Sequence, residues 1–185
     1  VGSEMCIRDR TLNPDTPRSR ELWKQGVEHL KFVAGLYRKQ VAEGRVFLHE
    51  HPAHAKSWNL TVVREVMRQE GVHLYEADQC MYGLFTRGQK GYKLVPAKKP
   101  TKFMTNSRAL GRELQRRCDK THTHQSLVDG RASDAAKYPE GLCRAICRGI
   151  MQEKKERLMQ IRAVMEVDED SKLKWQGPEM DHDRE

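Results

Sequence analysis

Hydrophobic residues recur at alternating spacings of four and three between residues 16 and 44, which predicts one long amphipathic helix. Thr16 followed by Pro17 is typical of a helix start, and Gly44 is typical of a helix end. The apolar stripe consists of Trp23, Val27, Leu30, Ala34, Tyr37 and Val41. We expect this stripe to pack against the core.

Two short apolar runs follow, with a helical pattern between them. Residues 45–49 are typical of a buried strand and residues 72–76 of a second one. Val62, Val63, Val66 and Met67 lie on one helical face between them, and Gly71 marks the end of that helix. A strand–helix–strand order predicts a right-handed crossover between parallel strands.

The next segment predicts a hairpin arm. Residues 81–84 and 92–95 flank a loop bounded by glycines, and residues 102–105 add a further extended run. Ser107 then caps a helix that we expect to continue to residue 117. Pro139 opens a long C-terminal helix, which Leu142, Ile146 and Ile150 would dock onto the core.

These elements predict an α/β fold: a partial Rossmann-like, methyltransferase-type three-layer unit with a parallel strand–helix–strand core, a hairpin arm and a long C-terminal helix. We expect this unit to occupy residues 16–165. Residues 166–185 are predicted to be an acidic disordered tail. Residues 1–15 are interpreted as artefactual or disordered, because residues 1–10 resemble a translated sequencing adapter; we therefore expect the original chain to continue upstream.

Charge is distributed unevenly along the 185 residues. The net charge is +8, but residues 166–185 hold eight acidic and three basic residues, so the rest of the chain carries +13. A body this basic favours a polyanionic partner such as DNA or RNA, although many basic domains are merely well solvated.

The sequence contains no apolar run long enough for a membrane span and no visible secretory signal in its first thirty residues. Its five cysteines do not form a spaced disulfide framework. We therefore expect an intracellular protein, nuclear or cytoplasmic, that does not contact a membrane.

Two carboxylates follow the two predicted strands. Glu50 and Asp78 would lie at the same edge of a parallel sheet, where they could face one cleft. A carboxylate in such a place can bind a base or position a substrate amine, so both residues are candidate catalytic groups. The alternative is that they only cap loops.

Cys118, His122 and His124 place three potential zinc ligands within seven residues. Cys143 or Cys147 of the last helix could supply the fourth ligand. No pair shows the two-residue gap of the common zinc motifs, so buried cysteine and solvated histidine remain the alternative.

The predicted hairpin arm is rich in basic and aromatic residues, which could hold phosphates and stack on unpaired bases. A solubilised exposed hairpin is the alternative. The candidate nucleic-acid-binding residues are Arg87, Lys90, Lys93, Lys98, Lys99, Lys102, Tyr82 and Phe103.

Residues 45–107 resemble the C-terminal half of the cytosine-5 DNA methyltransferase fold. Glu50 ends a strand as that family's base-pairing glutamate does, and the Tyr-Gly-Leu-Phe-Thr-Arg run that ends at Arg87 is similar to a second family block. His51-Pro52 and Phe85-Thr86 depart from the family pattern. No glycine-rich adenosylmethionine loop or Pro-Cys nucleophile loop matches in this chain, so the resemblance implies that S-adenosylmethionine would bind only an intact parent protein.

A longer stretch, about residues 30–149, resembles an uncharacterised segment of Pol polyproteins from Copia-like retrotransposons of algal protists. The matching runs include Phe-Leu-His-Glu-His-Pro at residues 47–52, Asp-Gln-Cys-Met-Tyr-Gly at 78–83 and Lys-Pro-Thr-Lys-Phe-Met-Thr-Asn-Ser at 99–107. The resemblance implies a truncated retroelement fragment with a catalytically incomplete, nucleic-acid-handling domain. Its partners would be nucleic acid and the upstream part of the same polyprotein. The alternative is a non-enzymatic module that binds nucleic acid or protein and is stabilised by zinc.

Overall fold

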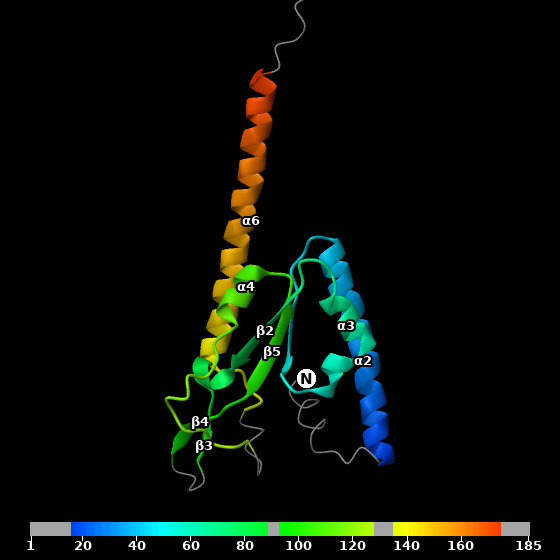
Figure 1. Cartoon of the computed structure of the whole chain (residues 1–185), viewed down its shortest axis with the longest axis vertical. Helices are drawn as coiled ribbons and strands as arrows, with labels where there is room; N and C mark the ends of the chain where they lie inside the picture. Colours follow the sequence, from blue (N-terminus) through cyan, green and yellow to red (C-terminus); the bar gives the residue numbers. More distant parts are fainter. Residues whose placement is uncertain (1–15, 89–92, 128–134, 175–185) are drawn as a thin grey trace, which may run out of the picture.

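The computed structural model describes residues 16–88, 93–127 and 135–174, with the side chains of residues 167–174 left out of the description. It contains helices on both faces of a small antiparallel sheet (Figure 1). The elements are α2 (Pro17–Ala42), β1 (Leu48–Pro52), η1 (Lys56–Asn59), α3 (Thr61–Met67), β2 (His73–Asp78), η2 (Gln79–Tyr82), β3 (Phe85–Arg87), β4 (Leu94–Pro96), β5 (Pro100–Thr105), α4 (Arg108–Glu113) and α6 (Glu140–Lys174).

The main sheet has the strand order β1-β5-β2, and β5 pairs antiparallel with both neighbours. β1 and β2 therefore run in the same direction, as the crossover through α3 predicts, but they are not neighbours. This corrects the expected parallel core: β5, assigned from the sequence to the hairpin arm, lies between the two strands instead. The fold is a mixed α/β arrangement, and a Rossmann-like parallel core is not shown.

Alternation along the strands gives the sheet two different apolar faces. One face carries Met104 against Leu30 and Ala34 of α2 and Val66 of α3. The opposite face carries Phe103, which packs in a cluster with residues of α4 and α6, including Leu110, Leu142 and Ala145. β5 thus contributes a buried side chain to both cores, which explains why it occupies the centre of the sheet.

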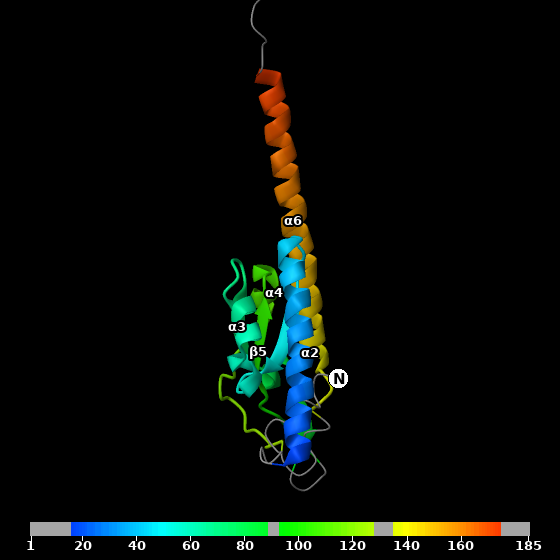
Figure 2. The ribbon, with the colours of Figure 1, turned by 90° about the vertical axis from the view of Figure 1, so that its right-hand side faces the viewer.

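The long helices α2 and α6 begin where the sequence patterns predict, but α6 extends further than expected. Thr16 caps α2 by accepting a hydrogen bond from the Ser19 amide, and Pro17 is its first residue. α6 continues past residue 166 to Lys174, and it projects well beyond α2 and the sheet (Figure 2). The helix therefore continues through the predicted start of the disordered acidic tail at residue 166. Residues 175–185 lie outside the described part of the chain.

The predicted hairpin arm is reduced to β3 and β4, which pair antiparallel as a separate two-stranded sheet. The Thr86 side chain is buried on its inner face, whereas Phe85 and Arg87 are exposed on its outer face. The tip of the arm, residues 89–92, lies outside the described residues and includes Lys90.

Candidate metal centre

The first part of the site forms where β2 ends. Asp78 is the last residue of β2, and the short helix η2 follows immediately. η2 places Cys80, a buried residue, just beyond the end of β2. Gly83 ends this turn in the left-handed conformation with φ of 83°.

The second part is the loop after α4, which runs along β2. The Asp78 amide donates to the Arg116 carbonyl over 2.9 Å, and the Cys118 amide donates to Asp78 Oδ2 over 2.9 Å. The hydroxyl of Tyr82 is also bound here, donating to the Glu113 carbonyl and accepting from the Arg116 amide. These bonds attach Cys118 to the end of β2, next to Cys80.

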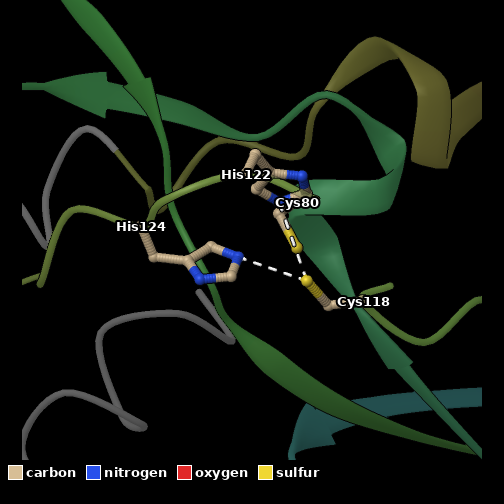
Figure 3. Close-up of side chains that lie close together, drawn as sticks. All are labelled: Cys80, Cys118, His122 and His124. Carbon is tan, nitrogen blue, oxygen red and sulfur yellow. Dashed lines mark hydrogen bonds between the residues drawn. The ribbon is translucent and has the colours of Figure 1, made fainter. Parts of the chain in front are cut away.

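A tight turn brings two histidines back to Cys118. Asp119 Oδ1 accepts hydrogen bonds from the amide and the hydroxyl of Thr121, and Lys120 has a φ of 64°. Cys118 Sγ then lies 3.7 Å from His122 Nε2 and 3.4 Å from His124 Nε2. Figure 3 shows the side chains of Cys80, Cys118, His122 and His124 converging from these separate segments.

The ligand atoms of Cys80, Cys118, His122 and His124 all lie within 4.8 Å of one another. Zinc bound by two thiolates and two imidazoles has bonds of about 2.0–2.3 Å, so adjacent ligand atoms in a tetrahedron are roughly 3.3–3.8 Å apart. The two measured sulfur–nitrogen distances fall in that range. The cluster could therefore hold a metal ion such as zinc after small movements of the remaining pairs.

The electrostatics of the cluster also fit a cation. Burial, together with the hydrogen bond and charge of Cys118 and the charge of Asp78, raises the pKa of the Cys80 thiol to about 12. Asp78 Oδ1 is buried and has no hydrogen-bond partner among the described residues. Two thiols and this carboxylate thus lie together, with Arg117 Nε 3.4 Å from Asp78 Oδ2. A bound divalent cation would favour the thiolate form of Cys80, which is the form that binds metals.

The histidines are suited to the same role. Burial, followed by the charges of His122 and Lys98, lowers the pKa of His124 below its usual value. The neutral imidazole that this favours is the form that binds metals. His122 Nδ1 lies 4.0 Å from Asp119 Oδ1, so a carboxylate is close to the ring nitrogen that faces away from the cluster.

The structure corrects the predicted fourth ligand. Cys143 and Cys147 are both exposed on α6, and Cys80 is the residue that completes the cluster. The sequence holds a weak signal for it, because Cys80 lies a few residues after the predicted strand of residues 72–76. Its pairing with a cysteine in a distant loop depends on the tertiary structure.

Glu50 and Asp78, predicted to share a cleft, lie apart. Glu50 is within β1 rather than at its end, and it faces the α6 side of the sheet, where its Oε2 accepts a hydrogen bond from the Tyr138 hydroxyl over 2.7 Å. Asp78 lies at the opposite edge and contacts Arg117 and Cys118. The reason is β5, which separates the two strands, together with the strand register, which points the two carboxylates to opposite faces.

The predicted nucleic-acid-binding residues divide into three groups. Tyr82 and Phe103 are buried core residues, so neither ring is available for base stacking in this structure. Lys99 donates to the Ala135 carbonyl, and Lys102 is paired with Glu76. The exposed members are Arg87, Lys93 and Lys98, with Lys90 outside the described residues.

Phe85, in the small β3–β4 sheet, is an exposed aromatic residue, with 48% of its surface accessible. It lies in β3 on the same face as Arg87, because the Thr86 side chain between them points inward. The period-two pattern of a strand is the signal that could have selected Phe85 in place of Tyr82 and Phe103.

None of the described helices is long and apolar enough to cross a membrane.

The sequence matches no protein-family model, and searches of curated proteins and of solved structures give no significant match. Nothing in the described residues indicates a site for S-adenosylmethionine.

Proposed function

We propose that the chain is a non-enzymatic zinc-binding module that binds nucleic acid, with the metal ion fixing the loop of residues 118–124 against the end of β2. The observation that carries this proposal is the convergence of four thiol and imidazole ligands from η2 and the post-α4 loop within 4.8 Å. Two cysteines and two histidines are a common ligand set of structural zinc sites. Such a set leaves no open position for substrate chemistry, so a structural role is favoured.

The nucleic-acid part of the proposal rests on charge and exposure near the metal centre. Lys98 is exposed and close enough to His124 to influence its pKa, and Lys120 is exposed in the metal-binding loop itself. β3 adds Arg87 and the exposed ring of Phe85, and the exposed Lys93 directly precedes β4. Lysines beside an exposed aromatic residue suit single-stranded DNA or RNA, in which phosphates and unpaired bases are both accessible.

Metal content and stability test the zinc part. The purified chain should contain about one zinc ion per molecule, and removal of zinc by a chelator should lower the unfolding temperature because the ion binds only the folded site tightly. A chain that contains no zinc after expression with zinc, and that gains no stability from added zinc, would contradict this part.

Salt dependence tests the nucleic-acid part. We expect the affinity for a fluorescent single-stranded oligonucleotide to fall steeply between 50 and 200 mM salt, since phosphate contacts release counterions. Lys98→Gln should weaken binding and reduce the slope by about 1. Lys24→Gln, a change of the same charge on the exposed surface of α2, is the matched control and should have no such effect. Affinity that is independent of salt would rule out phosphate-driven binding.

A further inference from the structure

β1 is an edge strand of the main sheet, and no strand of the described residues pairs with its outer side. The Ala53 amide donates to the Pro100 carbonyl over 3.0 Å, which fixes the phase of the antiparallel ladder between β1 and β5. Alternation then directs the backbone groups of His49 and His51 toward β5 and those of Leu48 and Glu50 away from it. The amides and carbonyls of Leu48 and Glu50 have no partner among the described residues.

This edge lies in a groove of about 300 Å³ between α2 and α6. α2 contributes Leu30 and Val33 to one wall, and α6 contributes Leu142 and Ile146 to the other. The groove therefore combines a row of unpaired backbone donors and acceptors with two apolar walls, which is the arrangement that binds an extended peptide by strand addition.

Glu50 gives the groove a charge preference. It is the acidic residue among those that line the groove, and the Tyr138 hydroxyl holds its Oε2 in place. Gln79, which is completely buried, places its side-chain amide 3.4 Å from the other carboxylate oxygen. A carboxylate held on both oxygens at a strand edge favours a basic residue directly opposite on an added strand.

We propose that the free edge of β1 binds an extended peptide of another protein, with a lysine or arginine opposite Glu50 and apolar residues on both sides of it. The residue opposite Leu48 would lie on the same face as the basic residue, toward Leu142 and Ile146. The residue between them would point toward Leu30 and Val33 of α2, because successive side chains of a strand alternate. The metal centre lies at the end of β2, the other edge strand, and none of its four ligand residues lines the groove.

A symmetric probe tests the proposal whichever direction the added strand takes. We would measure binding of a fluorescent peptide with the core Val-Val-Lys-Val-Val, flanked by serines, to the full zinc-loaded chain. Replacing its lysine by glutamate should weaken binding at least about tenfold, because two carboxylates would then face each other. N-methylation of the lysine and of the following valine should abolish binding, because it removes the backbone donors without changing the protein.

Two variants locate the binding site on the chain. Glu50→Gln should weaken binding about threefold to tenfold by removing the opposite charge. Glu76→Gln, which removes the same charge from β2 at the other edge of the sheet, should leave peptide affinity unchanged. Equal binding of the N-methylated peptide, or an equal effect of the two variants, would overturn the proposal.

Sedimentation of the free chain distinguishes a second copy from a peptide as the occupant. We expect a chain that stays monomeric at the concentrations used for peptide binding. The opposite result would be a concentration-dependent dimer that Glu50→Gln weakens, together with no binding of the peptide at a concentration of about 1 mM. That result would assign the edge to self-association and overturn the proposal.

Discussion

A largely buried imidazole on the α2 side of β1, that of His49, makes the stability of the fold depend on pH. His49 Nδ1 lies 3.0 Å from the Tyr37 hydroxyl, and its ring contacts Trp58 edge-on with 5.2 Å between centroids. Burial, with a smaller contribution from the charge of His51, lowers the pKa of His49 from 6.5 to about 4. The folded protein therefore holds this side chain neutral under conditions in which the unfolded chain would protonate it.

The sign and size of the effect follow from this difference. As the pH falls below 6.5, the unfolded chain binds a proton at His49 before the folded chain does, so the free energy of unfolding decreases. The loss is complete below about pH 4. Each pKa unit corresponds to about 1.4 kcal/mol, so the full loss is about 3 kcal/mol.

Urea unfolding at several pH values between 7 and 4 measures this loss. The comparison is between the natural chain and His49→Gln, which cannot titrate at this position but keeps a polar group near Tyr37. The difference between the two curves removes the contribution of the metal ligands, which both proteins share. We expect the His49→Gln curve to be flatter by about 3 kcal/mol, and parallel curves would refute the assignment of a neutral buried imidazole.

Two further predictions concern glycines and cysteines. Gly35→Ala on α2 meets no atom within 4 Å and should raise the free energy of unfolding by up to about 1 kcal/mol, whereas Gly149→Ala on α6 would place a Cβ 2.8 Å from Leu110 Cα and should lower it by about 1–3 kcal/mol. Thermal unfolding checks both, and stabilisation by both would contradict the close approach of α4 and α6. Cys80→Ser should lower zinc content and stability, whereas Cys143→Ser, at an exposed position, should change neither; zinc loss in Cys143→Ser instead would place the fourth ligand on α6.

The starts of the helices could be predicted from the sequence because capping residues and hydrophobic periodicity are local signals. α2 begins at the predicted Thr16-Pro17 cap and ends just before Gly44. The Ser107 cap opens α4 as predicted, but α4 ends at Glu113 and not at the predicted residue 117. The apolar stripe on α2 predicted burial only in part, because Trp23 is 42% exposed whereas Leu30 and Ala34 are buried. The first turns of α2 extend past the end of the main sheet (Figure 1), so the sheet does not cover that part of the helix, which the sequence pattern could not show.

The position of β5 could not be obtained from local patterns. Its alternating residues are equally compatible with a hairpin arm and with a central strand, and the choice depends on pairing with β1 and β2, which lie far away in sequence. Dependence on contacts between distant parts of the chain also explains why the predicted metal-ligand set differs from the observed one. Cys118, His122 and His124 are close in sequence, whereas Cys80 joins them only because the loop after α4 is bound to the end of β2.

The absorption spectrum of the cobalt-substituted chain tests the central claim most directly. Co²⁺ bound by two thiolates and two imidazoles in a tetrahedron should give strong visible bands and sulfur-to-cobalt charge-transfer bands, and zinc should displace it. We predict one cobalt ion per chain with this spectrum, lost in Cys80→Ser and retained in Cys143→Ser. A chain that binds no cobalt, or binds it with the weak bands of six oxygen and nitrogen ligands, would contradict the proposed metal centre.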